Sequence, residues 1–201
     1  MKKTYRNIIL LTFVLFSCAF ISPHKGLNEY GKWLEFHSLK NEHFVKSETE
    51  VERKMIWSDY GLTNDYIELF QHFFIHSPDS NHFIDLDTYS LVLEEDKNGN
   101  LYSYGSGVDI KIQLVSTVKM TSTTLLFCGT ECYPETTIWR NNSRLEIFGF
   151  KINQDDNFVP TIWKIDIKNM LFTEYSNKKI FSKMPESYSQ ERRLKEVEFK
   201  E

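Results

Sequence analysis

Short runs of alternating apolar and polar residues dominate the second half of the chain. Between Asp109 and Val115, the apolar residues Ile110, Ile112 and Leu114 alternate with polar ones, and this period of two is typical of a half-buried strand. Similar extended runs, each followed by turn residues, lie at 123–127, 136–140, 145–151, 161–167 and 170–175. Short strands at this spacing predict an antiparallel β meander.

The segment from Asn64 to Ile75 has the period of a helix. Thr63 or Asn64 can cap its first turn, and Ser77 stands before a proline, which disfavours helical angles. We therefore expect an amphipathic helix packed on the sheet. Its apolar residues recur at three- and four-residue steps; they are Tyr66, Leu69, Phe70, Phe73 and Phe74.

A hairpin is predicted at Asp96–Asn100, because Asn98-Gly99 tolerates the positive φ angles of a tight turn. After Pro185 we expect a short helix and then a strand that carries Val197 and Phe199. Residues 31–60 fit no single period, since their first third matches a helical face and the rest matches either a strand or a helix.

Two tetrapeptides echo one another. Thr137-Ile138-Trp139-Arg140 recurs as Thr161-Ile162-Trp163-Lys164, and each is followed by a turn and another extended run. Two short echoes are too few for a repeat architecture. They indicate two similar hairpins in one sheet.

Composition supports a β-rich chain. The only alanine is Ala19, while aromatic residues make up 15% of the sequence; alanine favours helices, and aromatic residues favour strands. The sequence thus predicts an α+β fold, mainly an antiparallel β meander (sandwich-like or a curved sheet) with one amphipathic helix. We place it in a single domain over residues 31–201.

The N-terminus has the layout of an export signal. Lys2, Lys3 and Arg6 precede the apolar run Ile8–Phe16, and small residues follow. The run is shorter than the roughly 20 apolar residues that cross a bilayer. A removable signal is therefore favoured over a membrane anchor.

The four residues Leu15-Phe16-Ser17-Cys18 resemble the lipobox of small bacterial lipoproteins. The resemblance implies a signal peptide at 1–17, a lipid on Cys18, a tether at 18–30 and attachment to a membrane of the cell envelope, facing the periplasm or the outside. It implies no particular activity. Alternatively, Ser17-Cys18-Ala19 suits ordinary cleavage after residue 19, which would give a secreted soluble protein.

Either cleavage leaves one cysteine pair, Cys128 and Cys132, in an oxidising compartment where a disulfide is the default. We expect it to staple a hairpin turn between two strands. A redox dithiol would use Cys-x-x-Cys at the start of a helix, which this loop lacks. Copper sites with paired cysteines also need a downstream histidine, and every histidine here, from His24 to His82, lies upstream.

Charge argues against nucleic acid as a partner. Removing the signal takes away three of the 24 basic residues and none of the 28 acidic ones, which leaves a net charge of about −7, the wrong sign for a phosphate backbone.

Neither a catalytic motif nor a cofactor motif is present. His72 and His76 are four residues apart but lack a partner motif, and the Asp96 loop has its glycine where a hairpin needs it rather than where an EF-hand does. We predict no metal and no cofactor.

The candidate binding residues are aromatic: Trp139, Trp163 and Tyr133, because such side chains offer contact area and a polar group. The favoured hypothesis is a non-enzymatic binding or accessory module with a protein or glycan ligand. Two alternatives stay open: an envelope hydrolase with an unrecognised site, and a protective partner of a toxin or hydrolase.

Overall fold

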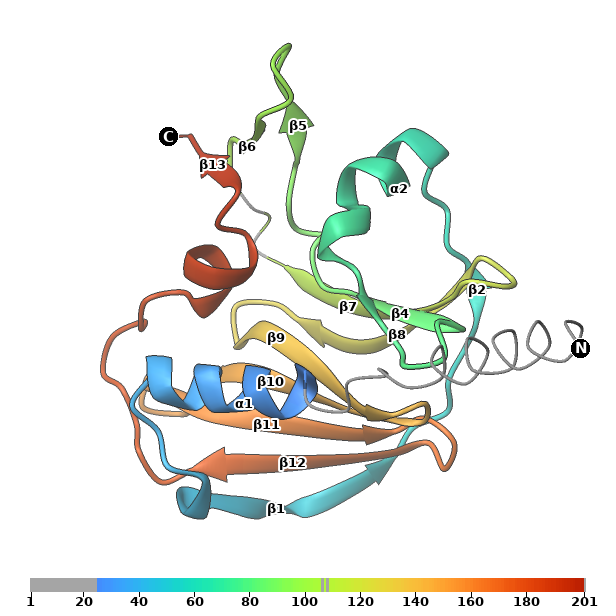
Figure 1. Ribbon diagram of the computed structural model, residues 1–201. Helices are drawn as coiled ribbons and strands as arrows, with labels where there is room; N and C mark the ends of the chain where they lie inside the picture. Colours follow the sequence, from blue (N-terminus) through green and yellow to red (C-terminus); the bar gives the residue numbers. More distant parts are fainter. Residues whose placement is uncertain (1–24, 106, 108, 201) are drawn as a thin grey trace, which may run out of the picture.

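Two five-stranded antiparallel sheets face one another at the centre of the molecule (Figure 1). The structure is a computed structural model and describes residues 25–105, 107 and 109–200. Sheet A has the strand order β1-β12-β11-β10-β9, and sheet B has the order β2-β8-β7-β4-β3. A third, small sheet, β13-β6-β5, lies beside sheet B.

The elements follow one another along the chain with these bounds: α1 Lys25–Phe36, η1 Asn41–His43, β1 Phe44–Glu52, β2 Ser58–Asp59, α2 Asn64–Phe70, η2 Gln71–Phe73, β3 Ile75–His76, β4 His82–Asp85, β5 Glu94–Glu95, β6 Leu101–Ser103, β7 Ile110–Ser116, β8 Thr121–Cys128, β9 Cys132–Asn141, β10 Arg144–Ile152, β11 Phe158–Asp166, β12 Leu171–Asn177, η3 Ser189–Arg193 and β13 Val197–Phe199.

The main core lies between the two sheets. Successive residues of a strand point to opposite faces, so Ile147 of β10 enters this core while Phe148 points to the other side of sheet A. Sheet B contributes Ile112 and Leu114 from β7. Both faces of sheet A are covered, which explains why β10 reads as a nearly continuous apolar run.

Helix α1 covers the outer face of sheet A. Trp33 is fully buried there against Phe148 and Phe150, together with Tyr188 from the C-terminal segment. The sequence left this stretch open and placed a tether up to residue 30, whereas α1 begins at Lys25. Two helices therefore pack on the sheets rather than one.

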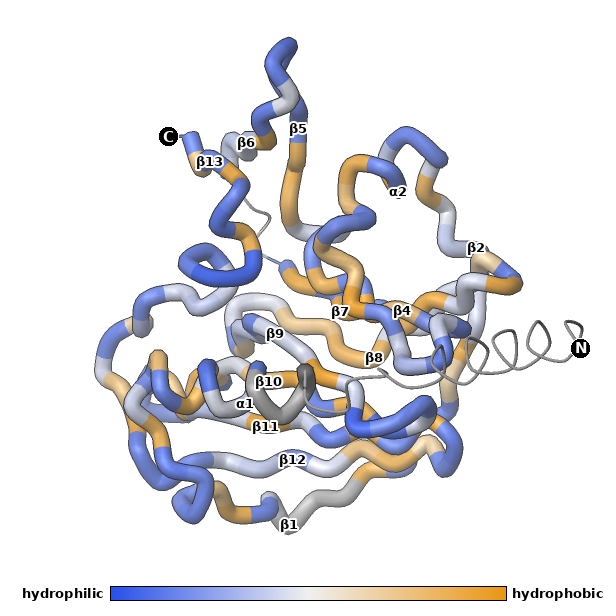
Figure 2. Tube along the Cα trace, in the orientation of Figure 1, coloured by the Kyte–Doolittle hydropathy of each residue, from blue (hydrophilic) through white to orange (hydrophobic). Residues whose placement is uncertain are grey.

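Helix α2 covers the outer face of sheet B, as its apolar stripe predicts, but it ends at Phe70 rather than Ile75: η2 follows over Gln71–Phe73, and Ile75 begins β3. Thr63 caps it by accepting a hydrogen bond from the N–H of Tyr66, and Phe74 stacks on Phe83 of β4 with ring centroids 4.3 Å apart. Leu194 and Val197 complete this layer. Figure 2 shows hydrophobic stretches along the strands of both sheets.

The predicted strands between residues 109 and 175 are confirmed, and neighbouring strands within the two large sheets pair antiparallel as expected. The Thr-Ile-Trp echoes lie in one sheet, in β9 and β11 on either side of β10, and the tail forms η3 and then β13 as expected. The expected hairpin at 123–140 is wrong: β8 belongs to sheet B and β9 to sheet A. Residues 129–131 form a crossover between the sheets, and periodicity cannot reveal which sheet a strand joins.

A β-bulge interrupts β9 at Glu135. Thr136 pairs with Phe148 and Pro134 with Gly149, so Glu135 is an extra residue. A Cβ at position 149 would lie 2.1 Å from the carbonyl oxygen of Tyr133, so the two strands approach closely only because residue 149 is glycine. Bulges redirect side chains, and this one turns Glu135 towards α1.

Candidate functional site: an open groove between the sheets

An open groove of about 310 Å³ separates the sheets on the side where β1 and β8 lie at the margins. Leu125 and Leu126 of β8 form one wall, and Trp163 and Ile165 of β11 form the floor. Beyond Ser122, β8 pairs only with β7, so no strand of the described chain closes this side. The other lining residues come from β1, β10, β12 and the residue after β1; they are Ser47, Val51, Arg53, Lys151, Phe172, Thr173 and Glu174.

Charged groups lie along the rim of the groove. Lys151 donates to both carboxylate oxygens of Glu174 at 3.1 Å, so these two charges satisfy one another. The guanidinium of Arg53 lies 5.1 Å from the centroid of the Phe172 ring and makes no ion pair with any residue that the structure describes. Arg53 is therefore the cation that a bound anionic group could reach.

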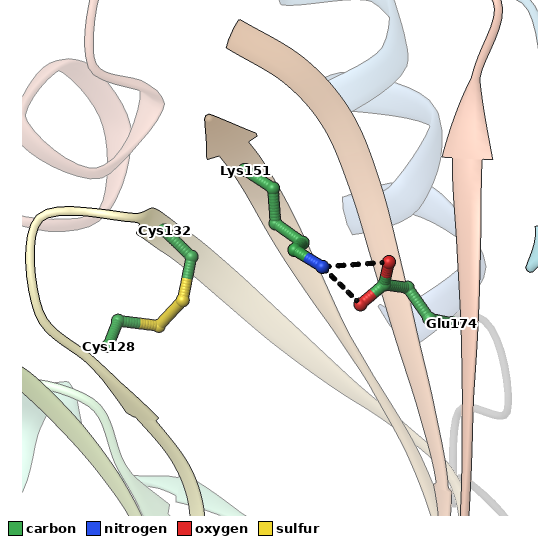
Figure 3. The surroundings of a disulfide bond; sticks show 4 residues. All are labelled: Cys128, Cys132, Lys151 and Glu174. Atoms are coloured by element: carbon green, nitrogen blue, oxygen red, sulfur yellow. Dashed lines mark hydrogen bonds and ion pairs between the residues drawn. A yellow bond between two sulfur atoms is a disulfide. The ribbon is translucent and has the colours of Figure 1, made fainter. Parts of the chain in front are cut away.

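The disulfide loop borders one end of the groove. The sulfur atoms of Cys128 and Cys132 lie at disulfide distance, with Cα atoms 5.3 Å apart, and Lys151 is the cross-strand partner of Cys132. Figure 3 shows the loop beside the Lys151–Glu174 pair. Because β8 and β9 belong to different sheets, the cysteine pair fastens one sheet to the other.

The aromatic candidates occupy three different settings. Trp163 is 8% exposed and lines the groove, whereas Trp139 is half-buried at the opposite margin and donates through Nε1 to the carbonyl oxygen of Ile75 in β3 at 2.9 Å. Tyr133 lies at the bulge, 5.8 Å from the Phe158 ring, on a trans peptide bond. The structure does not bring the three together, and only Trp163 faces the groove.

A second cavity, of about 430 Å³, lies under the segment that joins β1 to β2. Met55 and Trp57 of that segment line it together with Met170 and Lys168 of the β11–β12 turn. This cavity opens at the end of the molecule that carries the β9–β10 and β11–β12 turns.

A buried polar cluster surrounds Glu135, which is 3% exposed. Oε2 accepts a hydrogen bond from Trp33 Nε1 and lies 2.8 Å from His37 Nε2, while Oε1 accepts from the backbone N–H of Tyr188. Such a glutamate–histidine pair resembles acid–base machinery, but it lies beneath α1 and lines neither cavity. It fastens α1 and the C-terminal segment to sheet A.

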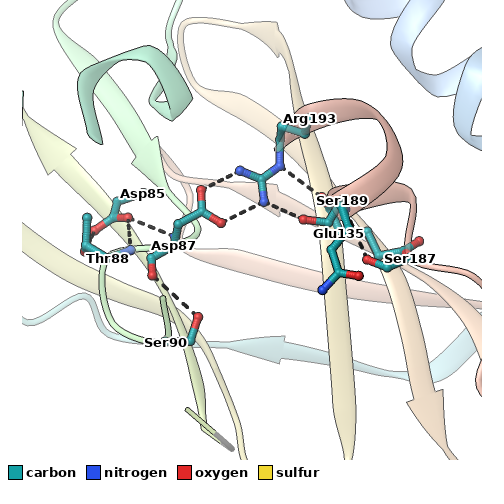
Figure 4. A network of polar contacts seen from close by, with 9 residues as sticks. Asp85, Asp87, Thr88, Ser90, Glu135, Ser187, Ser189 and Arg193 are labelled. Carbon is teal, nitrogen blue, oxygen red and sulfur yellow. Dashed lines mark hydrogen bonds and ion pairs between the residues drawn. The ribbon is translucent and has the colours of Figure 1, made fainter. Parts of the chain in front are cut away.

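A neighbouring network joins Arg193 of η3 to sheet B (Figure 4). Arg193 donates through two nitrogens to the carboxylate of Asp87 and through Nε to the backbone oxygen of Glu135. Burial raises the pKa of Asp85, which accepts hydrogen bonds from Thr88 and Tyr60. Sequence reasoning missed both networks, because their members are far apart along the chain.

The remaining sequence candidates do not converge. Among the described residues there is no group of three metal-ligating side chains, so His72 and His76 stand without further ligands. The carboxylate of Asp96 accepts hydrogen bonds from the N–H groups of Asn100 and Asn98, which lowers its pKa to about 2. These hydrogen bonds engage the Asp96 carboxylate within the hairpin turn.

Of the helices in the described part of the chain, none has the length and apolar character needed to cross a bilayer. Comparisons with protein-family models, with curated proteins and with solved structures gave no match.

Proposed function

We propose that this protein is an exported, lipid-anchored module of the cell envelope that binds an amphipathic ligand without acting on it. The observation that carries the proposal is the groove between β1 and β8, where apolar side chains of β8, β11 and β12 lie among polar ones and a cation, Arg53, stands at the rim. Clefts that combine apolar side chains with a few convergent polar groups are the usual form of ligand sites.

The compartment is inferred from cysteine chemistry. Cys128 and Cys132 lie at disulfide distance, which suits an oxidising compartment outside the cytoplasm. The lipobox-like Leu15–Cys18 supplies the anchor in this proposal.

The ligand class follows from the groove wall. Leu125, Trp163 and Phe172 favour an apolar segment, and burying it removes apolar surface from water. Arg53 favours a carboxylate or phosphate at one end, because a guanidinium can donate two parallel hydrogen bonds to such a group. The Lys151–Glu174 pair adds no net charge.

Calorimetric titration with decanoate, and with decan-1-ol as its uncharged counterpart, tests the proposal. We expect Val51→Trp, at the rim, to abolish decanoate binding by filling the groove. Val45→Trp is the matched control, because Val45 lies on the same strand, is exposed, and does not line the groove. It should bind as the unmodified protein does.

The charge is tested by Arg53→Gln. Losing a charge-assisted hydrogen bond costs about 1.5–3 kcal/mol, so decanoate affinity should fall roughly tenfold or more while decan-1-ol affinity stays the same. Lys54→Gln serves as its control, since Lys54 does not line the groove. Equal binding of decanoate to Val51→Trp and Val45→Trp would overturn the groove as the site.

A further inference from the structure

One end of the molecule carries exposed apolar side chains from three separate segments. The segment 53–60 is held between two hairpin turns: Arg53 N–H donates to the carbonyl of Met170, and Tyr60 N–H to that of Met120, both at 3.0 Å. Figure 1 shows the β7–β8 and β11–β12 turns at the same end of the sheets. We name the exposed apolar residues of this end the hairpin-tip face: Ile56, Trp57, Val118, Met120 and Met170.

The hairpin-tip face is well exposed. Val118 is 77% and Ile56 75% exposed, and Trp57 is 41% exposed. Single exposed apolar residues are common, but a group that spans adjoining segments marks an interaction surface. None of the five belongs to a core cluster.

Two residues of the hairpin-tip face have backbone angles that favour glycine. Met120 has φ 50° and Met170 φ 55°, in the left-handed region that residues with a Cβ rarely adopt. Glycine would be less strained at both positions. Ser38, Ser80 and Asp156 have similar angles in other turns, so the angles define the two turn conformations and do not by themselves mark the face.

Cations flank the apolar residues. Lys54, Lys119 and Lys168 are exposed, and none of them makes an ion pair with a residue that the structure describes. Exposed carboxylates nearby are Asp59, Glu52 and Asp79, the last in the β3–β4 turn that bonds to Thr117. Although the chain as a whole is acidic, this end combines exposed apolar groups with unpaired lysines, which is how peripheral proteins meet anionic lipid.

The direction of α1 places the N-terminal connection at this end. His37 lies beside Glu135, whereas Tyr30 lies under Arg140, with the guanidinium 5.6 Å from the ring centroid. Helix α1 therefore runs antiparallel to β9, and its first residue, Lys25, points towards the β9–β10 turn. Cys18 is seven residues earlier in the sequence, a reach of at most about 25 Å. A lipid on Cys18 would hold this end close to the bilayer.

We propose that the hairpin-tip face rests on an anionic bilayer, with Trp57 at the lipid interface and the three lysines against the headgroup phosphates. This inference rests on the lipid anchor of the proposed function. Tryptophan suits that depth, because its ring is apolar and its N–H is polar.

The test uses the lipidated full-length protein in vesicles of phosphatidylglycerol and phosphatidylethanolamine with brominated acyl chains, which quench tryptophan fluorescence at short range. We expect quenching in the unmodified protein and its loss in Trp57→Phe, because Trp33 and Trp163 are buried in the fold and Trp139 is half-buried. Replacing all three lysines by glutamine should reduce the quenching at least twofold.

A matched control is Val92→Glu, which changes an exposed apolar residue outside this face and should leave the quenching unchanged; Ile56→Glu should reduce it. If the protein floats with the vesicles but Trp57→Phe is quenched as strongly as the unmodified protein, the docking face is wrong while the anchor stands. If the protein does not float with the vesicles, the anchor itself fails, and the docking fails with it.

Discussion

The two margins of the sandwich are built in opposite ways. At the β9–β3 margin, Trp139 bridges the sheets through its bond to Ile75, and Glu135 and Arg193 tie in α1 and the C-terminal segment. At the β1–β8 margin, the sheets part around the groove. We call the first the sealed side and the second the open side.

The same sequence pattern serves both sides. Trp139 and Trp163 each follow Thr-Ile, yet the first joins the sheets and the second floors the groove. The difference comes from position: β9 is the edge of sheet A next to β3, while β11 is central. A tryptophan therefore gains its role from the strand order rather than from its local motif.

Removing the Glu135 carboxylate from the sealed side should have the largest effect on the free energy of unfolding. Glu135→Ala leaves Trp33 Nε1, His37 Nε2 and the Tyr188 N–H without their buried acceptor, and such a loss costs about 3–5 kcal/mol of unfolding free energy. Denaturant unfolding measures it.

The matched control lies on the open side. Glu174→Ala breaks an ion pair whose side chains are 42% and 25% exposed, and exposed pairs contribute less than about 1 kcal/mol. If Glu135→Ala and Glu174→Ala lowered the free energy of unfolding equally, the distinction between the sealed and open sides would be wrong.

Reducing the Cys128–Cys132 pair should lower the free energy of unfolding by an intermediate amount. Cys128 and Cys132 close a ring of about five residues, for which the chain-entropy model gives roughly 2 kcal/mol. Unfolding with and without reductant tests this, and mass analysis should show a gain of two protons on reduction. Free thiols in the exported protein would contradict the pairing.

Raising the pH should give the smallest effect, and on the sealed side. Burial, reinforced by the nearby Glu146 carboxylate, raises the pKa of Tyr30 from 10.0 to about 12. A raised pKa means that the folded state prefers the protonated phenol, so this stabilisation is complete below pH 10 and is lost as the pH rises towards 12. Tyrosinate absorbance of the unmodified protein minus that of Tyr30→Phe should show the shifted titration. A difference titration centred on pH 10 would contradict it.

The strands of the second half could be read from the sequence, because alternation and turn residues are local signals, whereas their division between two sheets could not. The period of β7 and the cap at Thr63 both matched the structure. Helix α1 could not be assigned, since its apolar residues, among them Trp33 and Phe36, fit a helical face over only two or three turns.

The site was less predictable. Trp163 was named as a candidate, but Arg53 gave no signal beyond a charge in a charged stretch. Glu135 lies two residues after Tyr133, which was named only for its aromatic ring, and its burial depends on the bulge opposite Gly149. Predicting that bulge would require knowing which residues of β9 and β10 face each other.

The last residues of the described chain close both outer layers. Tyr188 bonds to Glu135 over sheet A, Arg193 bonds to Asp87 in the bend after β4, and Val197 begins the strand that pairs in parallel with β6. In a chain that emerges N-terminus first, Oε1 of Glu135 lacks the Tyr188 N–H and Asp87 lacks the Arg193 guanidinium until these residues are present. The two outer layers are therefore complete only after residues 188–197 have been made.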